Sequence, residues 1–242
     1  MSEGERIAKV IARAGICSRR DAEKLILEGA VTVDGRTINS PALNVFPDNE
    51  ITVNGKSISS AKAEPRLFAM HKPAGLVTSE KDDQGRETVF DIIPKSLPRL
   101  VYVGRLDLNS EGLLLFTNDG DLKRKLELPK NEFERTYRVR MHGRPDAKAF
   151  DSLKNGITIE GVRYASIIVK IENQPSDAYN KSNFWATFTL KEGKNREIRR
   201  VCEYLGLGVN RLIRISYGPF SLGDIKVGEI KEIPYKEFKN LI

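Results

Sequence analysis

Gly104-Arg-Leu-Asp-Leu-Asn-Ser-Glu-Gly-Leu-Leu-Leu-Phe-Thr-Asn-Asp-Gly120 is the most informative stretch of the 242-residue chain. It predicts a strand over residues 100–103 that leads into a polar loop, and an apolar strand over residues 113–116 that leads out of it. Asp107 therefore lies on a loop that is held at both ends, which suits a catalytic carboxylate. An aspartate in a loop is also a common turn-former or cap, and the stretch alone leaves both interpretations open.

Strand patterns dominate the chain around this stretch. Short apolar runs predict strands over residues 67–70, 100–103, 113–116, 136–141, 167–171 and 185–190. Helical spacing of apolar residues predicts helices over residues 120–128, 145–154 and 195–205. Because strands outnumber helices and several adjoin by short turns, we predict an α+β fold with a large, mainly antiparallel sheet.

The first 58 residues form a separate small module by their own pattern. Apolar residues at helical spacing precede Gly15, and Ser18 starts a second helix with Asp21 three positions on, as in a capping box. Residues 31–38 and 51–58 each predict two strands joined by an Asp-Gly or Asn-Gly turn. Residues 59–66 are small, polar and Pro-containing, which is typical of a linker. We therefore predict domains over residues 1–58 and 67–242.

The charge of the chain favours a polyanionic partner. There are 40 Lys+Arg against 33 Asp+Glu, which gives a net charge of +7. Residues 1–60 are neutral overall and residues 61–120 carry −1, whereas residues 121–148 and 190–214 each carry +4. The excess therefore lies after residue 120. A solvated surface is the alternative, since binding needs these charges on one face.

Composition argues against several classes of protein. The apolar runs are far shorter than the ~20 residues that a membrane span needs, and the polar start of the chain does not fit a signal peptide, so we expect a cytoplasmic protein without a membrane partner. The 2 cysteines and 2 histidines lack ligand spacing, which argues against a disulfide framework and a metal site. The sequence also lacks phosphate-binding glycine motifs, and we expect no cofactor.

The run from Ile7 to Gly35 resembles the S4-like RNA-binding module. It reads I-A-K-V-I-A-R-A-G-I-C-S-R-R-D-A-E-K-L-I-L-E-G-A-V-T-V-D-G and covers two helices and a hairpin. In that family the second helix and the turn before it face structured RNA. The resemblance therefore implies RNA contacts from Arg13, Ser18, Arg19, Arg20 and Lys24. The alternative is an ordinary helix pair with solvated arginines.

Four further motifs, in order along the chain, resemble the RsuA/RluB family of rRNA pseudouridine synthases. Residues 104–120 are similar to its catalytic signature, and His71-Lys-Pro-Ala-Gly-Leu-Val-Thr-Ser79 is similar to its K-P-x-G motif. Glu134-Arg-Thr-Tyr-Arg-Val139 is similar to its E-x-x-Y-x-V motif. Leu190-Lys-Glu-Gly-Lys-Asn-Arg-Glu-Ile-Arg-Arg200 is similar to its E-G-K/R-x-R/H-x-I/V-R/K-R motif. The version with Asn195 and Arg196, together with the N-terminal module, looks closer to RluB-like enzymes of large-subunit rRNA than to RsuA-like enzymes of small-subunit rRNA.

The resemblance implies three catalytic residues. Asp107 would act at C1′ of the uridine as a nucleophile, or as a base on the 2′ position. Tyr137 would stack on the target uracil, and its hydroxyl would help to remove the C5 proton. Lys194 would pair with Asp107 and favour its charged form, with Arg196 as the runner-up. For both cations, phosphate contact or a solvated charge is the alternative.

Other residues are implied to bind RNA or to line the pocket. Arg105 would guide base flipping or fill the vacated gap, with a salt bridge to Asp119, to Asp121 or to phosphate as the competing interpretation. Leu190 and Ile198 would line the pocket wall, although core packing explains them nearly as well. A last group of arginines would follow the RNA backbone and make binding salt-dependent: Arg199, Arg200, Arg211 and Arg214. Arg211 and Arg214 flank the predicted strand Leu212-Ile213, which allows their side chains to point to different faces.

These expectations together define a function. We expect a monomer that isomerises one uridine to pseudouridine in 23S (large-subunit) rRNA, with rRNA as its partner. The alternatives are a 16S (small-subunit) rRNA pseudouridine synthase and a non-catalytic RNA-binding or ribosome-assembly factor. A glycosidase-like hydrolase is less favoured, because Glu111 is an unremarkable candidate for the second acid that such chemistry uses.

Overall fold

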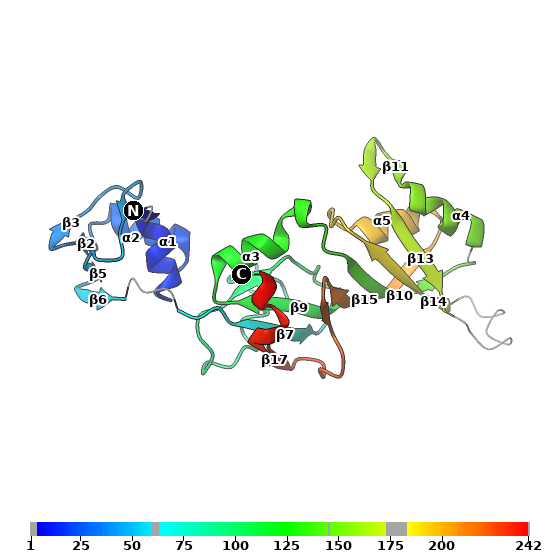
Figure 1. The fold of residues 1–242 in the computed structure, drawn as a ribbon. Helices are drawn as coiled ribbons and strands as arrows, with labels where there is room; N and C mark the ends of the chain where they lie inside the picture. Colours follow the sequence, from blue (N-terminus) through cyan, green and yellow to red (C-terminus); the bar gives the residue numbers. More distant parts are fainter. Residues whose placement is uncertain (1–3, 60–62, 145, 173–182, 242) are drawn as a thin grey trace. The chain divides into compact units, whose positions relative to one another are not determined.

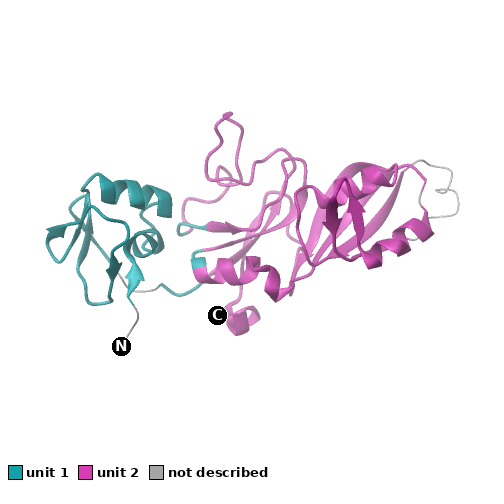
Figure 2. Ribbon diagram, turned by 90° about the horizontal axis from the view of Figure 1, so that it is seen from above, with its two compact units in different colours: residues 1–65, 98–100, 118–120 teal, residues 66–97, 101–117, 121–242 magenta. Residues whose placement is uncertain are grey.

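The chain divides into two compact units in a computed structural model that describes residues 4–59, 63–144, 146–172 and 183–241. Unit 1 comprises residues 1–65 with residues 98–100 and 118–120, and unit 2 comprises the other residues (Figure 2). The helices and strands of both units are labelled in Figure 1. In the described part of the chain, no helix is both long and apolar enough to cross a membrane.

Unit 1 packs two helices against a small sheet. The helices are α1 (Ile7–Arg13) and α2 (Arg19–Leu27). The sheet has the order β3-β2-β5-β6, from β2 (Val31–Val33), β3 (Arg36–Thr37), β5 (Ile51–Val53) and β6 (Lys56–Ile58), and β1 (Glu5–Arg6) pairs with β4 (Asn44–Val45). The core is formed by apolar side chains of both helices and the strands, among them Ile7, Ile11, Ile26, Val31 and Ile51.

The turn and cap signals of unit 1 are confirmed. The Ser18 hydroxyl accepts a hydrogen bond from the Asp21 N–H at 3.2 Å, which begins α2 as the capping box predicts. The two hairpin turns place Asp34-Gly35 at φ 49° and 75° and Asn54-Gly55 at φ 50° and 73°. Two successive positive φ angles define the tight hairpin turn that Asp-Gly and Asn-Gly favour, so both predicted hairpins form.

Unit 2 is built on one large sheet with the order β13-β14-β10-β15-β9-β7-β17. Its strands are β7 (Leu67–Lys72), β9 (Glu111–Thr117), β10 (Arg135–His142), β13 (Ile167–Ile171), β14 (Asn183–Leu190), β15 (Gly208–Tyr217) and β17 (Ile230–Ile233), with β8 (Val101–Val103) on β9 and β16 (Phe220–Ser221) on β15. In the described part of this sheet the pairings are antiparallel except for the parallel pair β15 and β9. The predicted α+β fold with a mainly antiparallel sheet is confirmed.

The helices of unit 2 are α3 (Gly120–Glu127), α4 (Ala147–Ser152) and α5 (Glu197–Tyr204), with short 3-10 helices at Pro129–Asn131, Leu153–Asn155, Tyr235–Glu237 and Lys239–Leu241. The helix predicted over residues 145–154 is shorter than expected, because Asp146 caps α4 by accepting from the N–H groups of Lys148 and Ala149; position 145 lies outside the described residues. The helix predicted from Asn195 begins two residues later, since Arg196 has φ 52°. A separate hairpin, β11 (Ile157–Ile159) with β12 (Val162–Tyr164), was not predicted.

Two hydrophobic cores support the sheet of unit 2. One core joins β10 and β14 to α4 and α5, through residues such as Val139, Phe188 and Val201. The other joins β7 and β9 to α3, through residues such as Leu115 and Leu126. Strand β15 contributes Leu212 to the first core and Ile213 to the second. The strand therefore links the two halves of the sheet, and the candidate site described next lies beside it.

Candidate active site

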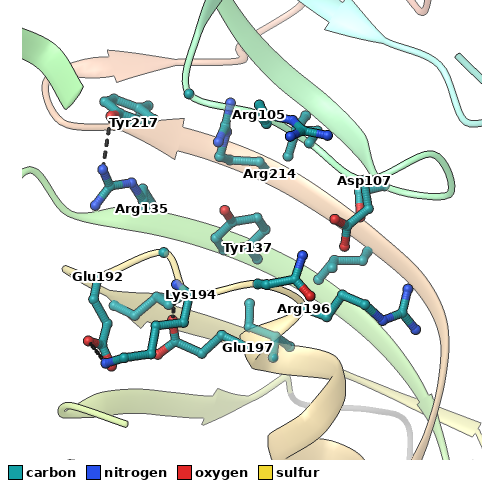
Figure 3. Close-up of a pocket in the computed structure, with 18 of the residues that line it drawn as sticks. Arg105, Asp107, Arg135, Tyr137, Glu192, Lys194, Arg196, Glu197, Arg214 and Tyr217 are labelled. Carbon is teal, nitrogen blue, oxygen red and sulfur yellow. Dashed lines mark hydrogen bonds and ion pairs between the residues drawn. The ribbon is translucent and has the colours of Figure 1, made fainter. Parts of the chain in front are cut away.

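A pocket opens in unit 2 where segments from five parts of the chain converge. It is lined by the loop after β8, by the end of α3 with Pro129, by β10, by the segment between β14 and α5, and by β15. The lining includes every residue predicted as catalytic or as pocket wall, together with three of the predicted RNA contacts: Asp107, Tyr137, Lys194, Leu190, Ile198, Arg105, Arg196 and Arg214. Residues far apart in the sequence are thus brought to one place, and Figure 3 shows Asp107 and Tyr137 facing the same space.

The loop that carries Asp107 is fixed through its backbone carbonyl groups. The buried Lys72 ammonium donates hydrogen bonds to the Leu108 and Ser110 carbonyl oxygens at 3.3 and 3.0 Å. The Thr78 hydroxyl donates to the Leu106 carbonyl at 2.8 Å, and an Arg199 Nη2 donates to the Asn109 carbonyl at 3.1 Å. The K-P-x-G segment and α5 therefore hold the loop on both sides of Asp107.

Two of these cations also act electrostatically with Asp107. Burial lowers the pKa of Lys72 to about 8, while Glu111 and Asp107 oppose that shift. Burial and Arg196 lower the pKa of Arg199, and Asp107 again acts in the opposite direction. Lys72 and Arg199 therefore supply positive charge to the surroundings of Asp107. Arg199, expected to contact the RNA backbone, is half-buried and donates to backbone carbonyls of its own chain.

Lys194 pairs with another residue than Asp107, its expected partner. Its ammonium forms an ion pair with Glu192, and in Figure 3 its side chain bends toward Glu192 and away from Asp107. Glu192 also accepts from the Ala165 N–H at 2.5 Å. Burial acts to raise the pKa of Glu192, but these hydrogen bonds outweigh it and leave the pKa lowered. Lys194 nevertheless lines the same pocket as Asp107.

Glu197 is a buried carboxyl group that is not among the predicted site residues. Its Oε2 accepts from the Lys194 N–H at 2.9 Å, and its Oε1 has no hydrogen-bond partner in the described structure. Burial raises the pKa of Glu197 to about 7, and the neighbouring Glu192 carboxylate adds to the rise. A signal was present in the sequence, because Glu197 lies one helical turn before Val201 and therefore on the apolar face of α5.

Tyr137 and Arg214 lie opposite each other on the neighbouring strands β10 and β15. Tyr137 is half-buried against the first core. Arg214 was expected to follow the RNA backbone, but only 2% of it is exposed and it lines the pocket. Arg211, expected in the same role, is exposed and donates two hydrogen bonds to the Glu111 carboxylate at 2.8 and 2.7 Å. Alternation along β15 therefore sends the two arginines to opposite faces of the sheet.

The other predicted RNA contacts have different surroundings. Arg105, Arg196 and Arg200 are exposed, and Arg105 and Arg196 line the pocket. In unit 1, α2 exposes Arg19, Arg20 and Lys24, and Ser18 caps that helix. Arg13 is half-buried and paired with Glu5. The three exposed cations of α2 are thus the more accessible part of the predicted surface of unit 1.

Both units match the sequence patterns of known protein families. The sequence pattern of the RNA pseudouridylate synthase family matches residues 66–204, which is more than half of the chain. The chain belongs to the RNA pseudouridylate synthase family. The S4 domain pattern matches residues 5–51, so this family member also carries an S4 domain at its N-terminal side. Both resemblances inferred from the sequence are confirmed.

Several relatives match this pseudouridine synthase over nearly its full length. An uncharacterized RNA pseudouridine synthase of Rickettsia felis is 53% identical over 96% of this chain and 98% of its own. The ribosomal large subunit pseudouridine synthase B of Bacillus subtilis is 37% identical over 98% of this chain and 95% of its own. A crystal structure of a pseudouridylate synthase covers 98% of this chain and 100% of its own, with 25% identity and a TM-score of 0.67. The protein is therefore a pseudouridine synthase of the RsuA/RluB type.

Proposed function

We propose that the protein isomerises one uridine of large-subunit ribosomal RNA to pseudouridine, with Asp107 as the carboxylate that acts at C1′. The substrate is supported by the large-subunit pseudouridine synthases B of Bacillus subtilis and Yersinia pestis, which are 37% and 40% identical to this chain. The role of Asp107 is supported by its place in the pocket, on a loop whose carbonyl groups are held by Lys72, Thr78 and Arg199. That loop is the observation that carries the proposal.

The proposed reaction breaks the N1–C1′ bond of the uridine and joins C5 to C1′. Asp107 either forms a bond to C1′ as the uracil leaves or removes the 2′ proton. The detached uracil turns and C5 bonds to C1′; in the first route this breaks the Asp107–C1′ bond, and in the second the 2′ position regains its proton. The C5 proton is lost while N1 gains one, so the reaction is an isomerisation. Tyr137 provides the flat surface on which the uracil stacks, and its hydroxyl assists the loss of the C5 proton. When the nucleotide binds, the Lys194 ammonium leaves Glu192 and contacts the nucleotide instead.

Each part of the chain has its own role in this reaction. Residues 1–58 bind structured RNA through the exposed cations of α2, residues 59–66 link the domains, and residues 67–242 carry out the reaction. Arg105 and Arg196 at the pocket and the exposed Arg200 bind the target strand, and the uridine leaves its stack to enter the pocket. We place this reaction in the bacterial cytoplasm, in line with the bacterial relatives that act on the ribosome.

The test is the Asp107→Asn variant, incubated in excess with transcripts of large- and small-subunit rRNA. We expect the single-turnover rate of pseudouridine formation to fall by at least about a thousandfold, because the group that acts at C1′ is lost. Asp224→Asn is the matched control, since Asp224 lies outside the pocket lining and is 96% exposed. Formation of pseudouridine by Asp107→Asn at the wild-type rate would contradict the mechanism. Modification of only the small-subunit transcript would contradict the substrate, and no modification by the wild type would favour a binding factor.

A further inference from the structure

Arg214 is a buried cation with an unused hydrogen-bond donor. Its Nε donates to the Leu113 carbonyl oxygen at 2.7 Å, and its guanidinium lies over the Tyr217 ring, 5.1 Å from the centroid. Its Nη2 is buried and has no hydrogen-bond partner in the described structure. A charge removed from water without a carboxylate partner lowers stability. The burial of such a cation is therefore better explained by the binding of a ligand than by a contribution to the stability of the fold.

The fold places this guanidinium beside the expected position of the uracil. Arg214 is directly opposite Tyr137 on β10 and opposite Gly112 on β9. A Cβ atom at Gly112, which has φ +101°, would lie 2.3 Å from the Arg214 carbonyl oxygen, so only glycine lets the strands approach this closely. Figure 3 shows Arg214 next to Tyr137, between Tyr217 and Arg105. The arginine thus belongs to the floor of the pocket.

We propose that Arg214 is a catalytic residue: its free Nη2 donates a hydrogen bond to a carbonyl oxygen of the target uracil and stabilises the negative charge that the base acquires when its glycosidic bond breaks. This inference rests on the proposed function. The electron pair of the N1–C1′ bond leaves with the base by either route open to Asp107, so the displaced uracil is an anion with charge on N1, O2 and O4. A fixed, desolvated cation is an effective stabiliser of such developing charge.

A backbone phosphate fits Arg214 less well than the base does. The phosphates of an extruded nucleotide stay with the RNA strand at the mouth of the pocket, whereas Arg214 is 2% exposed. The exposed side chains of Arg105 and Arg196 line the same pocket and are available to phosphates. The base is the part of the nucleotide that reaches the floor, and its carbonyl oxygens are acceptors for Nη2.

The test compares uridine with 5-fluorouridine at the target position of the RNA. Fluorine at C5 withdraws electrons, so the fluorinated base leaves with less help from a cation. We expect Arg214→Gln to slow the single-turnover loss of the N1-linked target nucleoside about a hundredfold on uridine, and less than about tenfold on 5-fluorouridine. The nucleosides are measured by mass spectrometry after digestion, with enzyme in excess. Arg140→Gln is the control, because Arg140 is exposed on β10, alternates with the pocket-facing positions and should change neither rate.

Equal slowing on the two substrates would overturn the proposal, because a purely structural loss does not depend on the leaving group. If Arg214→Gln lacks the wild-type unfolding transition in urea, Arg214→Lys replaces it, and equal slowing on both substrates again overturns the role. A different result would refute the proposed function itself: the wild-type enzyme would convert no uridine in either rRNA. A wild type that is active, with equal slowing in the variant, refutes only the role of Arg214.

Discussion

Lys72 connects a sequence motif to the position of Asp107. Its ammonium donates to the Pro73, Leu108 and Ser110 carbonyl oxygens at 2.9, 3.3 and 3.0 Å. Because its pKa is lowered to about 8, the side chain remains mostly charged at neutral pH. The lysine of the K-P-x-G segment thus acts on the loop backbone and, through its charge, on the surroundings of Asp107.

Replacement of Lys72 by methionine should affect stability and activity together. We expect the free energy of unfolding to fall by about 2 kcal/mol, because buried carbonyl groups lose their donor. The single-turnover rate should fall about tenfold, since small displacements of a reacting group are costly. Urea unfolding and a single-turnover assay measure the two effects, with the exposed Lys81→Met as the control. An unchanged unfolding transition would show that the loop does not depend on Lys72.

Single residues were predictable from the sequence where a motif marks them, but their partners were not. Asp107 and Tyr137 were expected at one site, and they line one pocket. The pairing of Lys194 with Asp107 was not found, because the nearer Glu192 binds its ammonium. Arg214 was expected to follow the RNA backbone, but it is buried and lines the pocket. Its alternation with the buried Leu212 was the available signal, but the Leu113 carbonyl that holds it is 101 residues away.

At the scale of elements, α5 begins with a buried carboxyl group. Glu197 and Val201 lie on the buried side of the helix, and burial raises the pKa of Glu197 from 4.5 to about 7. A pKa that is higher in the folded state stabilises the fold below about 4.5, and this contribution is lost as the pH rises through about 7.

Glu197→Gln should therefore flatten the dependence of stability on pH. We expect the free energy of unfolding of the wild type to decrease more steeply between pH 4.5 and 7 than that of the variant, with the two differing most above pH 7. Urea unfolding at intervals across this range measures the difference. Glu203→Gln, at an exposed position of the same helix, should retain the wild-type slope. Parallel curves for wild type and Glu197→Gln would contradict the raised pKa.

Elements with local signals were predicted well, and those that depend on distant partners were not. The hairpin turns at Asp34-Gly35 and Asn54-Gly55 and the strand β9 follow from their own residues. The full length of β15 does not follow from its own residues, because its polar residues form a strand only through pairing with β10 and β9 on either side. The parallel pairing of β15 with β9 joins residues about a hundred positions apart, which short-range pattern does not report.

For the molecule as a whole, the net charge of +7 is unevenly distributed. The excess lies after residue 120, whereas residues 1–60 hold equal numbers of basic and acidic residues. Part of the basic surface of unit 2 is neutralised within the chain, because Arg138 and Arg211 are paired with Glu172 and Glu111. The RNA recognition proposed for unit 1 would then depend on where a few cations lie rather than on its overall charge.

The exposed cations of α2 provide the test of that idea. Replacing Arg19, Arg20 and Lys24 together by glutamine should weaken binding to rRNA and lower the slope of log affinity against log salt by about 2 to 3, because three phosphate contacts are lost. The single-turnover rate at saturating enzyme should stay near the wild-type rate, because none of the three lines the pocket. Filter binding over a range of salt concentrations measures the slope, and Arg36→Gln with Lys56→Gln, two exposed cations of the hairpins in the same unit, is the control. An unchanged slope would mean that α2 does not contact RNA, whereas a lower rate at saturation would mean that unit 1 also positions the uridine for reaction.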